Sequence, residues 1–159
     1  MNQTLTPTDL ENFMEDHDIP GEIIYMDVPT PTVESAAEAV GTQPSRIVKS
    51  VLFHIQDSHI LAIATGTHRI DRRSIAVHFG VGKKQVKLSS PETVQSVTGY
   101  PVGTVPPFGH LTPLSTLIDQ ELLKMDVIYA GGGAHNALVR LNPQDILRVS
   151  KGHILDLHN

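Results

Sequence analysis

Three consecutive glycines, Gly131, Gly132 and Gly133, could do chemistry through their backbone. They lie between the apolar runs 127–130 and 137–141, which are typical of short strands. Without side chains, the N–H groups of such a turn are unobstructed, and the turn can direct two of them toward an anion. An ordinary tight turn has the same composition. The candidate chemistry is therefore stabilisation of an anion or oxyanion.

Two further side chains each have a functional and a structural interpretation. Lys49 lies in the β-rich run 46–55, and lysine suits a point-charge contact, although a single lysine in a strand usually points to solvent. His135 lies in the glycine-rich turn and not on a periodic face. A hydrogen bond that stabilises the turn explains it at least as well as catalysis.

The segment 100–113 is predicted to be a structured loop, because it carries four prolines and two glycines. Prolines fix the backbone path, so the loop has a defined shape with few regular hydrogen bonds. Loops of this length usually serve a function.

Several other kinds of site are not encoded. The segment Gly80-Val-Gly82-Lys83-Lys84 lacks the spacing and the Ser/Thr of a phosphate-binding loop, and no G-x-S-x-G motif occurs. The nine histidines form no H-x-x-x-H, H-x-H or H-E-x-x-H pattern, and there is no cysteine. We therefore expect no metal site and no acyl-enzyme intermediate.

The elements that position these residues mix helix and strand. The capping box Thr8-Asp-Leu-Glu11 predicts an amphipathic helix that ends at Pro20, followed by a strand at 22–28 and a helix at 33–40. The runs 46–55 and 60–64 favour a hairpin. Asp71 and Ser90 are predicted N-caps of helices ending at Phe79 and Thr98, and Asn142 caps a last short helix. Because the sequence shows no repeat or linker, we expect residues 1–159 to form a single α/β domain.

The charge distribution restricts the partners. A formal net charge of −5 argues against indiscriminate binding to a polyanion. Half of the twelve lysines and arginines nevertheless cluster in one segment with Asp71 as its only acid, namely Arg69, Arg72, Arg73, Lys83, Lys84 and Lys87. The cluster is either a solvated face or a local docking surface for an RNA acceptor stem. No apolar run is long enough to cross a bilayer, and the first residues lack a basic segment followed by an apolar one, so we expect a cytoplasmic protein.

Three segments in order resemble the YbaK/prolyl-tRNA-synthetase-associated domain family. Ile47-Val-Lys49-Ser-Val-Leu-Phe53 is similar to the strand that bears the family lysine, and Thr98-Gly-Tyr-Pro-Val-Gly103-Thr-Val-Pro-Pro107-Phe-Gly109 is similar to its G-x-x-x-P loop. Ile128-Tyr-Ala-Gly131-Gly-Gly133 is similar to its strand-to-glycine turn. The resemblance covers roughly residues 34–147 and implies one mixed, barrel-like sheet with surrounding helices.

This resemblance implies a freestanding aminoacyl-tRNA deacylase, which hydrolyses the ester of mischarged tRNA. Lys49 would anchor the carbonyl or phosphate, the glycine-turn amides would contact the same groups, and the 2′-hydroxyl of the substrate would help to orient water. Ser50 and His135 are further substrate-binding candidates. The loop would form one wall of the amino-acid pocket through Gly103, Thr104, Val105, Pro106 and Pro107.

The implied partners are mischarged tRNA and an aminoacyl-tRNA synthetase, with no organic cofactor, DNA or membrane, and the chain is expected to be a monomer or weak dimer. A noncatalytic tRNA- or synthetase-binding module of the same fold is the main alternative, and a small-molecule esterase is another. The amino acid removed stays open among proline-sized, cysteine, alanine, serine and threonine substrates.

Overall fold

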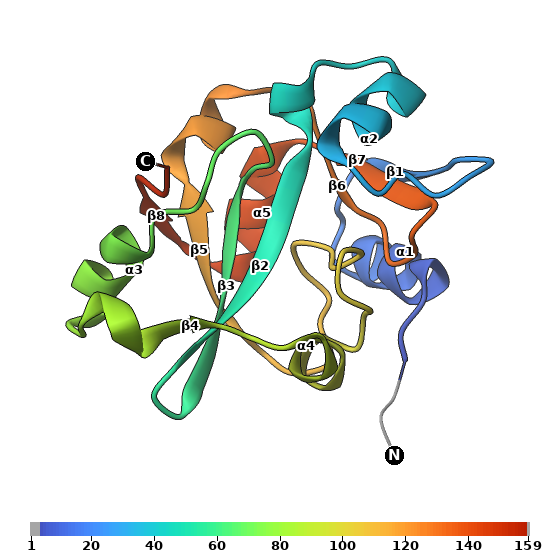
Figure 1. The fold of residues 1–159 in the computed structure, drawn as a ribbon. Helices are drawn as coiled ribbons and strands as arrows, with labels where there is room; N and C mark the ends of the chain where they lie inside the picture. The colour runs from blue at the N-terminus through green and yellow to red at the C-terminus, as the bar shows by residue number, and fades with distance from the viewer. Residues whose placement is uncertain (1–3, 159) are drawn as a thin grey trace.

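The computed structural model describes residues 4–158, which form five α-helices and eight β-strands in a mixed arrangement (Figure 1). This confirms the α/β class. The helices are α1 (Pro7–Asp16), α2 (Val33–Val40), α3 (Arg72–Phe79), α4 (Pro91–Thr98) and α5 (Pro143–Ser150). The strands are β1 (Gly21–Tyr25), β2 (Val48–Ile55), β3 (Ser58–Thr65), β4 (Val86–Leu88), β5 (Ser115–Asp119), β6 (Ile128–Gly131), β7 (Ala137–Leu141) and β8 (His153–Leu155).

The larger sheet has the strand order β4-β2-β3-β5-β8. The predicted hairpin is confirmed as the antiparallel pair of β2 and β3, in which Lys49 faces Ala64. β5 pairs with β3 in parallel, and β8 pairs in parallel with β5. Leu61 packs into one core cluster and Ile60 and Ala62 into another, so β3 is buried on both faces. Burial on both faces explains its unbroken apolar sequence.

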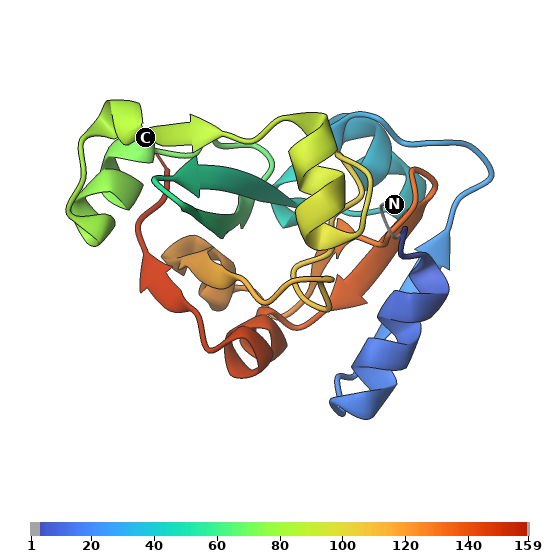
Figure 2. The same ribbon diagram turned by 90° about the horizontal axis from the view of Figure 1, so that it is seen from below.

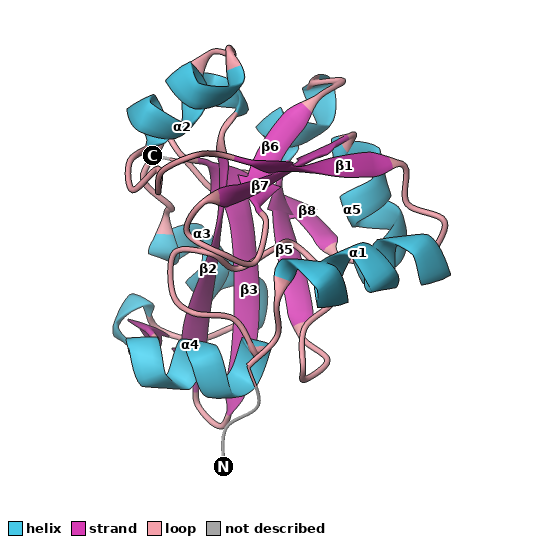
Figure 3. Cartoon of the chain, turned by 90° about the vertical axis from the view of Figure 1, so that its right-hand side faces the viewer, coloured by secondary structure: helices cyan, strands magenta, loops and turns pink. Residues whose placement is uncertain are grey.

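The smaller sheet is antiparallel, with the order β1-β7-β6. A parallel bridge between Ile47 and Tyr129 connects it to the larger sheet where β2 begins. The strands therefore divide into two connected sheets, and the smaller one crosses an end of the larger one (Figure 3). The glycine-rich turn joins β6 to β7 at this junction.

The helices lie around the outside of the strands (Figure 2). Three of them begin and end where the sequence predicts: Thr32, Asp71 and Ser90 accept the capping hydrogen bonds, and Gly41, Gly80 and Gly99 end the helices in the left-handed conformation. No helix in the described part of the chain is both long and apolar enough to pass through a bilayer.

Several predicted boundaries were wrong. α1 is capped by Thr6, whose capping box closes with Asp9, and not by Thr8 with Glu11. β1 ends at Tyr25, before the predicted end at 28, and Arg46 lies in a 3₁₀ turn ahead of β2. β4, β5 and β8 were not predicted. The segment 100–114 contains no helix or strand, as expected of the loop.

Candidate functional site

A small cavity of about 200 Å³ lies where the two sheets meet. It is bounded by the start of β2, the end of β6, the loop after α4 and the segment that leads into α2. Its lining residues are Thr30, Pro31, Thr32, Val33, Ala36, Ile47, Val48, Lys49, Ser50, Gly103, Val105, Gly131 and Leu138. The fold thus brings the lysine, the loop and the glycine turn to one place.

Lys49 is half-buried on β2 and lines this cavity. Burial lowers the pKa of its ammonium group, and the positive charge of Arg69 lowers it further. A half-buried lysine interacts more strongly with an anion than an exposed one does, because fewer water molecules screen its charge.

The three glycines of the turn have different surroundings. The Gly132 N–H donates to the Ala137 carbonyl (3.1 Å), and the Gly133 N–H donates to the Thr104 carbonyl (3.0 Å). These two amides are thus occupied within the protein. Successive amides of an antiparallel strand point to opposite edges, so the Gly131 N–H points away from β7, toward β2. Gly131 is also the member of the turn that lines the cavity.

The predicted loop contributes to the cavity through two residues, Gly103 and Val105. Thr104 is buried between them, and its hydroxyl donates to the Pro101 carbonyl (2.8 Å). Pro106 and Pro107 are buried elsewhere: the Pro106 carbonyl accepts a hydrogen bond from His110 Nε2 (2.7 Å), and Pro107 lines a different cavity. The prolines therefore fix the loop without lining the cavity.

Ser50 and His135 occupy different positions. Ser50 lines the cavity, and its buried hydroxyl has no hydrogen-bond partner within residues 4–158. His135 is exposed outside the lining, beside the loop: a Cβ atom placed on Gly103 would lie 3.9 Å from its Cε1 atom. The His135 carbonyl accepts the Thr30 N–H (3.2 Å), which joins the turn to the segment before α2.

The sequence did not identify the wall formed by 30–33 and Ala36. The sequence predicted a helix at 33–40, but only the tertiary fold places the start of that helix against β2. No local signal assigns Ile47, Val48 or Leu138 to a cavity, because apolar strand residues are typical of any core.

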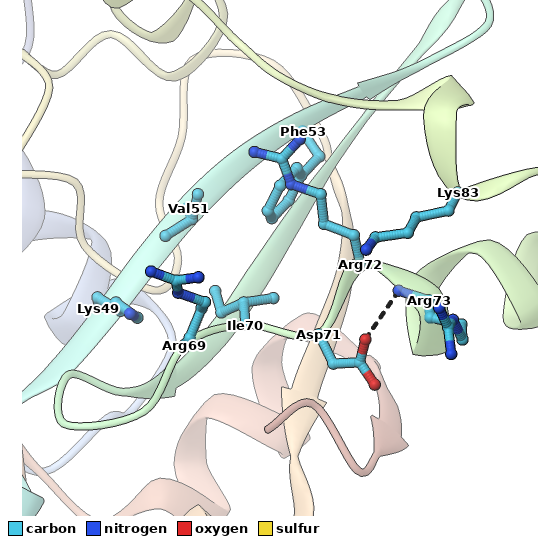
Figure 4. A pocket seen from close by; sticks show the side chains of 9 residues that line it. All are labelled: Lys49, Val51, Phe53, Arg69, Ile70, Asp71, Arg72, Arg73 and Lys83. Atoms are coloured by element: carbon cyan, nitrogen blue, oxygen red, sulfur yellow. Dashed lines mark hydrogen bonds between the residues drawn. The ribbon is translucent and has the colours of Figure 1, made fainter. Parts of the chain in front are cut away.

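A basic groove of about 560 Å³ lies beside this cavity (Figure 4). Lys49 lines both, and the groove continues along β2 to the start of α3. Its lining residues are Lys49, Val51, Phe53, Arg69, Ile70, Asp71, Arg72, Arg73 and Lys83. Four of the six clustered cations thus line the groove, whereas Lys84 and Lys87 are exposed outside it.

The positive charge of the groove is not neutralised internally. Within residues 4–158, none of its five cations lies within salt-bridge distance of a carboxylate. Its one acid, Asp71, instead accepts hydrogen bonds from the Arg73 N–H (2.9 Å) and the Ser74 hydroxyl (3.1 Å) at the start of α3. The groove therefore attracts anions. Arg72 also lies 5.6 Å above the Phe53 ring, which holds the guanidinium against the groove wall.

Fold and site together define a small α/β domain in which a strand lysine and a glycine turn share a compact cavity beside a cationic groove. The chain belongs to the aminoacyl-tRNA editing domain family, whose profile matches residues 27–149. The family resemblance of the three segments is thereby confirmed.

Three similar proteins illustrate this relationship. The uncharacterised protein YwhH of Bacillus subtilis (strain 168) is 30% identical over 130 residues, which cover 81% of each chain. Proline–tRNA ligase of Thermotoga neapolitana is 30% identical over 108 residues, which cover 66% of this chain and 18% of the ligase. A solved structure provisionally described as a trans-editing enzyme for prolyl-tRNA synthetase has a TM-score of 0.89 and 29% identity, with 96% of each chain covered.

The close packing of Gly131 against the loop makes it sensitive to substitution. A Cβ atom there would lie 2.5 Å from the Val105 carbonyl oxygen and 2.7 Å from that of Thr104. Because backbone atoms must move, we expect Gly131→Ala to lower the free energy of unfolding by about 1–3 kcal/mol in urea denaturation. The control is Gly82→Ala, where the nearest atom is 3.7 Å away. Equal stability of the two variants would contradict the packing.

Proposed function

We propose that this protein is an aminoacyl-tRNA deacylase that acts in trans on mischarged tRNA. The observation that carries the proposal is that Lys49 and Gly131 line one small cavity, and that Lys49 also lines an unneutralised basic groove. Membership of the editing domain family supports the reaction class, and the similarity to a proline–tRNA ligase supports the link to tRNA and a synthetase.

The reaction is the hydrolysis of an ester between an amino acid and the terminal ribose. A water oxygen bonds to the ester carbonyl carbon, the bond from that carbon to the ribose oxygen breaks, and the ribose oxygen takes a proton. The difficult step places negative charge on the carbonyl oxygen. In our proposal, the Lys49 ammonium and the Gly131 N–H stabilise this charge, and the neighbouring ribose hydroxyl of the substrate orients the water.

The cavity favours a small, uncharged amino-acid side chain. Its volume is about 200 Å³, and the side chains of Val33, Ala36, Val105 and Leu138 contribute apolar walls. A cationic side chain would lose its hydration there without a partner of opposite sign, because Lys49 is the sole charged residue in the lining. An anionic side chain would pair with Lys49 and so compete with the ester carbonyl for its charge. The Ser50 hydroxyl, which lines the cavity and has no hydrogen-bond partner within residues 4–158, would help to orient the substrate.

The basic groove would bind the phosphates of the RNA next to the scissile ester. Phosphate contacts position a nucleic acid without reading its sequence, which fits a groove built from lysine and arginine. Because Lys49 lies at the junction, an RNA strand in the groove would lead directly into the cavity. The overall negative charge of the protein would confine RNA to this surface.

Replacement of Lys49 tests the proposal. We expect Lys49→Met to slow release of amino acid from mischarged tRNA about 100- to 1,000-fold, the usual cost of losing one oxyanion-stabilising contact. Lys124→Met is the control, because Lys124 is exposed and pairs with Glu121 away from the cavity. Thermal melting of both variants verifies that they fold.

Three outcomes would contradict this assignment. Wild-type release by Lys49→Met would remove the proposed role of the lysine. Binding of mischarged tRNA by the wild type without any release, across a panel of amino acids, would favour a noncatalytic module. Equal rates on simple amino-acid esters and on aminoacyl-tRNA would favour a small-molecule esterase.

The groove can be tested through the salt dependence of KM. We expect Lys83→Gln to raise KM and to reduce the slope of log KM against log salt by about one, because one phosphate contact is lost. The neighbouring residue provides the control, since Lys84 lies outside the groove and Lys84→Gln should change neither value. Equal effects of the two substitutions would show that the groove does not bind RNA.

The pH dependence of turnover should report the charge on Lys49. Its charged form acts, so turnover is retained below its pKa and lost as pH rises through it. Arg69 helps to lower this pKa, so Arg69→Gln should raise it and move the alkaline loss of kcat to higher pH. The measurement is the enzyme-dependent rate at saturating substrate between about pH 7 and 10. Arg73→Gln is the control within the same groove, and identical profiles for both variants would contradict the proposal.

A further inference from the structure

A cluster of side chains that could bind a metal ion lies at the β5–β8 edge of the larger sheet. Asp119 ends β5, and Asp156 and His158 follow β8, which pairs with β5. The ligand atoms of these three residues all lie within 4.8 Å of one another. None of them lines the cavity or the basic groove. Figure 1 shows this carboxyl-terminal segment beside β5 and the chain that enters α3.

Asp119 is the unusual member of the cluster, because its carboxylate side chain is fully buried. One carboxylate oxygen, Oδ1, accepts the Leu157 N–H (3.2 Å). The other, Oδ2, is buried without a hydrogen-bond partner within residues 4–158. A buried carboxylate oxygen without a partner is costly, so this atom requires either a proton donor or a cation.

His158 is the residue whose side chain lies next to Asp119 Oδ2. Its Nδ1 atom is 3.8 Å from Asp119 Oδ2 and 3.1 Å from Asp156 Oδ1. This nitrogen is also buried and, within the described residues, makes no contact with hydrogen-bond geometry. Two carboxylate oxygens and one imidazole nitrogen therefore converge within salt-bridge distance of the nitrogen but without hydrogen-bond geometry.

We propose that Asp119, Asp156 and His158 bind a divalent transition-metal ion, with Zn²⁺ as the best match. Zinc binds imidazole nitrogen and carboxylate oxygen at about 2.0–2.2 Å in tetrahedral geometry, which separates neighbouring ligand atoms by about 3.3–3.6 Å. The separations of 3.1 and 3.8 Å around Nδ1 lie close to this range on either side. Imidazole with two carboxylates also suits zinc better than magnesium or calcium, which prefer oxygen ligands alone.

His68 lies beside the cluster, with its ring centroid 4.8 Å from that of His158. Water or this imidazole would complete the coordination. With Nδ1 as the ligand, the proton of the neutral His158 ring lies on Nε2.

The position of the cluster indicates what bound metal would do. Leu157 accepts the Asp71 N–H through its carbonyl (2.6 Å), and His158 forms a bridge with Ile70. Both Ile70 and Asp71 line the basic groove. Metal would thus clamp the carboxyl-terminal segment to β5 and to one wall of the groove. This role is structural and does not depend on the proposed deacylase reaction.

The test is zinc binding by metal-stripped, tag-free protein, measured by equilibrium dialysis against zinc chloride and by thermal melting. We expect one zinc ion per chain, and a rise in melting temperature of about 5–10 °C at a zinc concentration 100 times the Kd. His158→Gln and Asp156→Asn should each weaken binding at least tenfold, since each removes one ligand. Both avoid Asp119, whose replacement in the core could prevent folding.

A second histidine pair provides the matched control. His54 and His59 face each other across β2 and β3, with ring centroids 5.0 Å apart, and could bind zinc on the surface. His59→Gln should leave the affinity and the melting shift unchanged. Loss of binding in His59→Gln, retention in His158→Gln, or absence of zinc binding by the wild type would each overturn the proposal, and the last result would leave a carboxylate–imidazolium cluster in its place.

Discussion

The hydrogen bond from the Gly133 N–H to the Thr104 carbonyl is the contact on which the candidate site depends. It joins a turn of the smaller sheet to a loop that follows α4, and Gly131 packs against the carbonyls of the same loop. No side chain could occupy the space between them. The lysine comes from the other sheet and a further wall from the segment before α2, so the cavity exists because four separate segments are held at one junction.

Local interactions explain which elements the sequence could predict. The helices capped by Thr32, Asp71 and Ser90 are specified by residues within one turn of their ends, and each ends at a glycine with positive φ. β5 and β8 are different, because each gains its hydrogen bonds from a parallel neighbour distant in sequence. The first helix was misplaced because Thr6 and Thr8 begin overlapping capping patterns, and only the structure shows that Asp9 closes the box.

The residues of the candidate cavity could be predicted from the sequence where they belong to the family motifs. Lys49, Gly103, Val105 and Gly131 lie together, as a single ligand-binding site requires. The family motifs did not reveal which of their residues face the cavity. The loop prolines Pro106 and Pro107 lie outside its lining, and the N–H groups of Gly132 and Gly133 are hydrogen-bonded within the protein. The wall before α2 and the cluster around Asp119 come from packing between distant segments, for which a single sequence carries no periodic signal.

The shared position of Lys49 makes its charge responsive to what occupies the neighbouring groove. In the free protein, the Arg69 guanidinium repels the ammonium and favours its neutral form. A polyanion over the groove would offset that repulsion and favour the protonated form. Lys49 would then stay protonated to a higher pH when RNA is bound. Without RNA, a smaller fraction of Lys49 would carry the charge, and the cavity would react more slowly with esters that are not attached to RNA. The phosphates of the RNA in the basic groove would in this way contribute to substrate selection, although they lie away from the ester bond that is cut.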